Sequence, residues 1–180
     1  VNIQTAPAKP LTRLEDMTRK LEASYLGDGK HWTSSIKKER TMIAGMDALN
    51  AVYEGARLKS KVIIARGKKT DFVFIFSAPI SQYPALVGEF NWMVGNFRPP
   101  AGEARIALVR SRAPPSPPDA ATGGRFKRFI DSGAGFSMDY PSGWEVSTPS
   151  PFTVVFNGAP GTAAFDVTVS VQNVKPPNIV

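Results

Sequence analysis

The sequence predicts an α+β protein in which an antiparallel β-sheet is flanked by helices. Two uninterrupted apolar runs, at 62–65 and 72–76, are typical of central strands that are covered on both faces. The turn between them, 66–71, is short, charged and contains glycine, which favours an antiparallel hairpin. After Pro79, apolar residues recur at helical spacing and predict an amphipathic helix lying on the sheet: Leu86, Phe90, Met93 and Phe97.

The chain before this hairpin predicts one helix and two strands. Thr12 and Glu15 have the spacing of a capping box, so a helix should begin there, and Gly27 should end it. The residues of its apolar face are Leu14, Met17, Leu21 and Tyr25, and the outward ones are Arg13, Asp16, Arg19, Lys20 and Glu22. Strands are expected at 32–43 and 49–58, on either side of a turn at 44–47.

The chain after Arg98 divides into a linker and a second group of strands. A short edge strand is expected at 106–109, and the proline-rich stretch from 113 to 124 predicts an extended spacer, with binding to a proline-recognising domain as the alternative. Strands are then expected at 126–130, 136–140, 144–146, 152–156 and 165–171. No predicted helix covers this group, so its apolar face needs a partner.

Composition restricts the chemistry that the chain can carry out. The sequence has no cysteine, which excludes disulfides, thiolate metal sites and a cysteine nucleophile. His31 is the only histidine, so a histidine metal cluster is excluded; a catalytic triad would need this residue, which we expect in a surface loop. The first residue is valine and no apolar run is long enough to span a membrane, which suggests a mature chain without its targeting peptide.

Positive charge is concentrated around the predicted central hairpin. The chain carries a net charge of +7, and no acidic residue lies between Gly55 and Thr70. A period of two places the first three basic residues of this stretch on one strand face. The stretch could bind a nucleic acid, an acidic surface or a protein partner. It could also be a solvated strand edge whose lysines prevent pairing with other chains. Its residues are Arg57, Lys59, Lys61, Arg66, Lys68 and Lys69.

The remaining polar and aromatic candidates have structural interpretations. The pairs Glu15/Asp16 and Asp139/Glu145 could serve acid–base chemistry or bind a cation, but the first suits a helix N-terminus and the second should point outward from strands. The glycines at 123–124 and 133–135 suit turns rather than a phosphate loop. Three tryptophans could stack on bases, but we expect at least two in the core: Trp32, Trp92 and Trp144.

The segment 135–146, GFSMDYPSGWEV, resembles the opening of PsbP-like domains, which share the Mog1/PsbP fold with the bacterial DcrB-like proteins. In that family the segment forms the first hairpin and is followed by two strands similar to 152–156 and 165–171. The later half of the family is a helix, several antiparallel strands and a final helix, which 11–98 resembles. The resemblance implies an α-β-α sandwich with no catalytic, cofactor or metal residues.

The two halves occur here in reversed order. Residues 1–98 resemble the later half, 99–123 form the linker, and 124–180 resemble the opening half, completing the same or a neighbouring sheet. Residues 169–177, VSVQNVKPP, also resemble 1–10, VNIQTAPAKP. A circular permutation, a fragment spanning two tandem repeats, or strand exchange between copies would each explain this order.

The resemblance implies a non-enzymatic accessory or assembly subunit that binds a larger protein complex, as PsbP-like proteins do for photosystems. It implies a place outside the cytoplasm, in the thylakoid lumen or the bacterial periplasm. The alternatives are a nucleic-acid or acidic-surface binding module that uses the basic residues between Arg57 and Lys69, and a secretion or effector chaperone. The absence of reactive residues also favours the accessory subunit, which needs no cofactor.

Overall fold

A computed structural model describes residues 14–25, 34–103, 126–162, 164–165 and 167–174. The described elements are α1 (Leu14–Tyr25), β1 (Ser34–Ile43), β2 (Met46–Glu54), β3 (Leu58–Arg66), β4 (Asp71–Pro79), α2 (Tyr83–Gly95), β5 (Phe126–Asp131), β6 (Phe136–Pro141), β7 (Glu145–Ser150), β8 (Thr153–Asn157) and β9 (Thr168–Val174).

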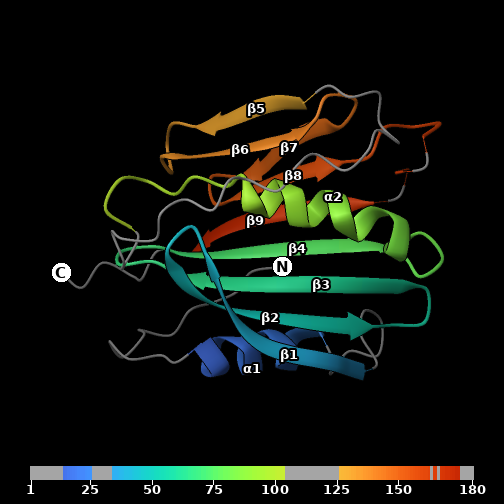
Figure 1. The fold of residues 1–180 in the computed structure, drawn as a ribbon, viewed down its shortest axis with the longest axis horizontal. Helices are drawn as coiled ribbons and strands as arrows, with labels where there is room; N and C mark the ends of the chain where they lie inside the picture. Colours follow the sequence, from blue (N-terminus) through green and yellow to red (C-terminus); the bar gives the residue numbers. More distant parts are fainter. Residues whose placement is uncertain (1–13, 26–33, 104–125, 163, 166, 175–180) are drawn as a thin grey trace.

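Seven of the described strands form one antiparallel sheet in the order β1-β2-β3-β4-β9-β8-β7, and β5 and β6 form a separate hairpin (Figure 1). Strand β9 pairs with β4 from Asp71↔Val174 to Ser77↔Thr168, so the last described strand lies in the middle of the sheet. The early and late segments of the chain therefore share one backbone ladder. The α+β class with a mainly antiparallel sheet is confirmed.

The two helices cover opposite faces of the sheet (Figure 1). Leu14 and Leu21 of α1 pack against apolar residues of β2, β3 and β4, including Tyr53 and Ile64. Helix α2 and the β5–β6 hairpin share the other face, where Phe74 and Phe156 belong to the larger core cluster. The layers are therefore helix, sheet, and helix with hairpin.

Strand β4 is apolar on both sides because it separates the two core clusters. Phe72, Phe74 and Phe76 are fully buried in the cluster under α2, while Val73 and Ile75 are buried in the cluster under α1. Burying one such side chain contributes roughly 1.5–3 kcal/mol relative to leaving it exposed. The uninterrupted apolar runs of β3 and β4 thus predicted central strands correctly.

Helix α2 ends just before the last residue of its predicted apolar stripe. Leu86, Phe90 and Met93 are buried on the sheet as expected, but the helix stops at Gly95. Phe97 follows the helix and inserts between strand aromatics, with ring centroids 5.0 Å from Phe72 and 4.9 Å from Phe74. The stripe identified core residues correctly, including one beyond the helix.

Helix α1 forms within the predicted range, but one of its predicted outward residues is wrong. Glu22 is half-buried and accepts a hydrogen bond from the Tyr53 hydroxyl at 2.9 Å. Burial is the main cause that raises the pKa of Tyr53, and the Glu22 carboxylate raises it further. Thr12, Arg13 and Gly27, the expected caps and outward arginine, lie outside the described residues.

Several predicted strand bounds are wrong because turns are tighter or longer than expected. Ala44 and Gly45, with φ of 47° and 78°, form a two-residue turn, so β2 begins at Met46 rather than at 49 and ends at Glu54 rather than at 58. Before β9, the N–H of Phe165 donates to the Thr162 carbonyl and the N–H of Val167 donates to the Ala164 carbonyl, so β9 begins at Thr168 rather than at 165, and Phe165 is half-exposed. The expected strand at 106–109 and the proline-rich stretch from 113 to 124 lie outside the described residues.

Candidate docking site

The structure divides the six basic residues between the two ends of β3. Arg57 lies in the turn before the strand, and Lys59 and Lys61 follow near its start. Arg66 ends the strand, and Lys68 and Lys69 lie in the turn that leads to β4. A nine-residue strand is about 30 Å long, so the six residues do not form one compact cluster.

Lys59 and Lys61 are held against the molecule rather than directed freely into solvent. Lys59 pairs with Glu54 at 3.2 Å and lies over the Tyr83 ring, 5.3 Å from its centroid. Lys61 donates a hydrogen bond to Asn91 Oδ1 at 2.7 Å, and burial lowers its pKa. The two lysines share a face, as predicted, whereas Arg57 precedes the strand.

The β3–β4 turn is fastened to the segment after α2 by one buried carboxylate. Glu103 Oε2 accepts hydrogen bonds from the backbone N–H of Lys69 at 2.8 Å and of Thr70 at 3.2 Å. The side chain is 4% exposed. A Cβ at Gly67 would lie 2.4 Å from Glu103 Oε2 and 2.3 Å from the Thr70 carbonyl, so only glycine fits this close approach. Lys68 and Lys69 are therefore displayed on a rigid turn with exposed side chains.

An open groove of about 540 Å³ lies at this same end of the molecule, between the β5–β6 turn and the β7–β8 turn. Phe129, Ile130 and Asp131 belong to one wall, and Pro149 and Pro151 to the other. Ile130 is 69% exposed, and Phe152, the residue after Pro151, is 54% exposed. Exposed apolar side chains gathered beside a groove mark binding surfaces. This groove is the main candidate site.

A short chain of contacts joins the β3–β4 turn to the groove. The N–H of Glu103 donates to the Pro100 carbonyl at 3.2 Å. A Cβ at Gly135 would lie 3.4 Å from the Pro100 ring, and the Gly135 N–H donates to the carbonyl of Asp131 at 2.7 Å. Lys68, Lys69 and the groove therefore belong to one continuous surface. We call this surface the turn end: Lys68, Lys69, Arg98, Ile130, Phe152 and the groove between the two hairpins.

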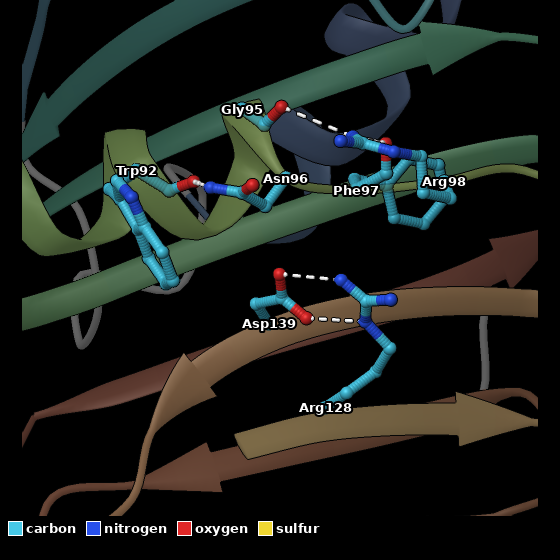
Figure 2. Close-up of polar contacts among 7 residues, drawn as sticks. All are labelled: Trp92, Gly95, Asn96, Phe97, Arg98, Arg128 and Asp139. Atoms are coloured by element: carbon cyan, nitrogen blue, oxygen red, sulfur yellow. Dashed lines mark hydrogen bonds and ion pairs between the residues drawn. The ribbon is translucent and has the colours of Figure 1, made fainter. Parts of the chain in front are cut away.

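Polar contacts around α2 and the small hairpin hold the supports of the turn end in place (Figure 2). Asn96 Nδ2 donates to the Trp92 carbonyl at 2.9 Å and closes the last turn of α2. Arg128 forms two hydrogen bonds with Asp139 across β5 and β6, at 2.7 and 3.0 Å, and this carboxylate raises the pKa of Arg128. The β5–β6 hairpin therefore reaches the groove with fixed register.

The other candidates from the sequence have structural positions or lie outside the described residues. Trp92 and Trp144 are 7% and 6% exposed, which confirms that at least two tryptophans are in the core. Glu15 and Asp16 are at the start of α1, as predicted. Asp139 pairs with Arg128, and Glu145 is exposed on β7. His31, Trp32 and the glycines at 123–124 lie outside the described residues.

A second pocket, of about 490 Å³, lies between α1 and the edge of the sheet. Acids and arginines line it, and ion pairs join Asp16 to Arg19 at 3.0 Å and Glu15 to Arg40. The acidic and basic residues of the lining are equal in number, so neither sign of charge is in excess. Its lining residues are Leu14, Glu15, Asp16, Arg19, Arg40, Asp47 and Arg66. Within the described part of the chain, no group of three or more His, Asp or Glu residues could hold a metal ion.

Sequence reasoning missed the groove and the carboxylate Glu103. The groove is formed by two turns that are about twenty residues apart in the chain, and only strand pairing brings them together. Apolar Ile130 and Phe152 at expected strand ends were the available signal. Glu103 lies in the stretch 99–123, which the sequence indicated only as a linker.

Comparisons of the chain with protein-family models, curated proteins and solved structures found no match. In the part of the chain that the structure describes, no helix combines the length and the apolar character needed to cross a membrane.

Proposed function

We propose that this protein is a non-enzymatic accessory or assembly subunit that binds a larger protein complex through the turn end. The observation that carries this proposal is the groove, whose lining residue Ile130 is 69% exposed and whose lining residue Pro151 is followed in the chain by Phe152, which is 54% exposed. Removing such apolar surface from water is worth about 25 cal/mol per Å², which is a driving force for association. Polar contacts already hold the β3–β4 turn and the β5–β6 hairpin in place, so less conformational entropy is lost when a partner binds.

The basic residues alone support a nucleic-acid interface less well. Three of them lie at each end of β3. Lys59 already forms an ion pair with Glu54, and Lys61 already donates a hydrogen bond to Asn91. Binding of a phosphate backbone is favoured by a continuous row of available cations. The apolar groove is more suitable for a polypeptide.

We further propose that the fold is that of the PsbP-like domains with its halves in permuted order, and that the protein acts in the thylakoid lumen or the bacterial periplasm. The resemblance of 135–146 to the family's opening hairpin supports this. The insertion of β9 between β4 and β8 also supports it, because a late segment completes a sheet begun by an early one. A rearranged chain, with 124–174 placed before 1–103, should fold with the circular dichroism spectrum of the natural order. A rearranged chain that fails to fold would count against permutation.

Site-specific crosslinking tests the proposed function. A photoreactive amino acid replaces Ser132, which is exposed on the groove wall, in protein added to an extract of the cells that make it. The expected product is a discrete crosslink to a larger protein, and the same product should disappear with Phe152→Ser. The matched control replaces Thr162, which is exposed in the β8–β9 connection, away from the groove. Crosslinks only within the chain, or equally from both positions, would contradict the proposal.

A further inference from the structure

Beside the apolar groove lie cations that have no carboxylate partner within the described part of the chain. Lys68 and Lys69 are exposed, and among the described residues no carboxylate pairs with either side chain. Arg98 is also exposed, and its Nη1 donates to the carbonyls of Phe97 at 3.1 Å and Gly95 at 3.4 Å (Figure 2). The nearby acid Glu103 is buried and directed to backbone N–H groups. The turn end therefore presents positive charge outward.

The acid on the groove wall is directed inward. Asp131 Oδ1 accepts a hydrogen bond from the N–H of Ala134 at 2.8 Å, which turns the carboxylate toward its own turn. Ser150 Oγ accepts a hydrogen bond from the N–H of Phe152 at 3.2 Å. The groove thus offers a partner apolar side chains together with the neutral polar side chains Ser132 and Thr148, and the β3–β4 turn offers cations.

The distance between these two parts follows from the sheet. The β3–β4 turn and the β7–β8 turn lie at the same end, three strand spacings apart in the order β3-β4-β9-β8-β7. Neighbouring strands are about 4.8 Å apart, so the two turns are separated by roughly 14 Å. An extended chain advances about 3.3 Å per residue, so about four residues span this distance.

We propose that the turn end binds an acidic, extended segment of the partner protein. An apolar side chain of that segment fills the groove between Ile130 and Pro151, and carboxylates about four residues away contact Lys68, Lys69 and Arg98. This inference rests on the proposed function and names the chemistry of its partner. A polypeptide fits better than a membrane because the groove lining also includes the polar residues Ser132 and Thr148, which a peptide backbone can contact.

Peptide binding to the 180-residue chain tests the inference. The probe is a fluorescent pool of peptides of about ten residues, with two Asp or Glu residues placed three to six positions from a Phe, Leu or Trp, a spacing that brackets the expected one. A matched pool carries Lys in place of each acid. Fluorescence anisotropy should show binding of the acidic pool, weaker affinity for the basic pool by about tenfold or more, and loss of binding at high salt.

Paired variants locate the binding surface. Lys68→Glu with Lys69→Glu, and separately Ile130→Ser with Phe152→Ser, should each weaken binding about tenfold. The charge control is Arg57→Glu with Lys127→Glu, and the apolar control is Ile80→Ser with Phe165→Ser; both use exposed residues outside the turn end and should leave affinity within about twofold. Circular dichroism confirms that each variant is folded.

The outcomes separate this inference from the proposed function. Equal binding of the two pools, or binding that the turn-end variants leave unchanged, overturns the acidic segment, whereas a crosslink from Ser132 would still support a protein partner. Vesicles of phosphatidylcholine and phosphatidylglycerol, in a roughly two-to-one ratio, test the other anionic surface by co-sedimentation. Vesicle binding that depends on Lys68, Lys69, Ile130 and Phe152, without peptide binding, overturns the inference in favour of a membrane.

Discussion

Glu89 carries a carboxyl group whose burial favours its neutral form. The residue lies on α2 and is 4% exposed, and no donor among the described residues reaches its Oε2. Burial raises its pKa. A carboxyl group whose folded-state pKa is raised binds protons more tightly when folded, so its contribution to stability is present at low pH and is lost as pH rises through the folded pKa.

Glu89→Gln should therefore stabilise the protein at neutral pH. We expect a gain on the order of 1 kcal/mol in the free energy of unfolding, because the buried charge is removed while the shape is kept. Urea denaturation between mildly acidic and neutral pH measures this gain, which should be small at the acidic end and should increase with pH. A difference between the two proteins that is constant with pH would contradict the prediction.

Gly158 is required because the following turn passes against its α-carbon. A Cβ at this position would lie 1.7 Å from the carbonyl oxygen of Ala164 and 2.4 Å from its carbonyl carbon, both backbone atoms. Gly158→Ala must therefore displace the connection between β8 and β9, and it should lower the free energy of unfolding by about 2–3 kcal/mol or more.

Gly88→Ala is the matched control for this prediction. A Cβ at Gly88, on the exposed side of α2, would meet no atom within 4 Å. Alanine should stabilise the helix there by roughly 0.5–1 kcal/mol, since glycine loses more backbone entropy on folding. Thermal unfolding midpoints that move in opposite directions for the two variants would support the geometry, and equal midpoints would not.

At the scale of elements, Glu103 is the link between the β3–β4 turn and the segment after α2. Its two hydrogen bonds to the N–H groups of Lys69 and Thr70 are made by a charged acceptor. Glu103→Ala leaves two backbone donors without this partner, and the expected cost is about 2 kcal/mol. Hydrogen exchange should also become faster at the amides of Lys69 and Thr70 than elsewhere in the sheet.

A variant at a distant carboxylate tests whether the cost comes from these hydrogen bonds or from the loss of any negative charge. Glu145→Ala, at an exposed position on β7, removes a carboxylate of the same kind, and its cost should stay within about 0.5 kcal/mol. Glu103→Gln keeps one acceptor oxygen and should fall between the two. Unchanged exchange at Lys69 and Thr70 in Glu103→Ala would show that the turn does not depend on this side chain.

Element by element, periodicity predicted types better than bounds. The runs at 62–65 and 72–76 and the stripe from Leu86 to Met93 were correct because burial against the sheet dictates both patterns. The bounds of β2 and β9 depend on the turn at Ala44–Gly45 and on the backbone hydrogen bonds of Phe165 and Val167, which the alternation of side chains does not encode. Tertiary contacts also placed Glu22 inward, toward Tyr53.

At the scale of the whole molecule, the sequence indicated that the late strands need a partner. It did not indicate the groove that forms when these strands pair with the early ones. The apolar alternation of β9 is explained by its position between β4 and β8, where Val169 and Val171 are buried. The groove and the cationic turn come from distant parts of the chain, so no local motif contains them. The resemblance to PsbP-like domains stays a prediction.

The shared ladder implies that the early and late segments fold as one unit. Strand β4 pairs with β3 on one side and with β9 on the other, and Phe72, Phe74 and Phe76 are buried in a cluster that includes β8 and β9. Residues 1–103 made alone would present the free edge of β4 from Asp71 to Ser77, with apolar surface beside it. Such an edge invites aggregation.

Separate chains of residues 1–103 and 126–180 should therefore show no cooperative thermal transition alone. When the two chains are produced together they should co-purify, and their mixture should regain one transition, because the ladder between β4 and β9 needs no covalent connection. Val171→Asp in the second chain places a charge in the buried cluster and should abolish association, whereas Ser147→Asp at an exposed position on β7 should not. Two chains that each unfold cooperatively by themselves would show two independent domains, and the proposed permuted domain would then be wrong.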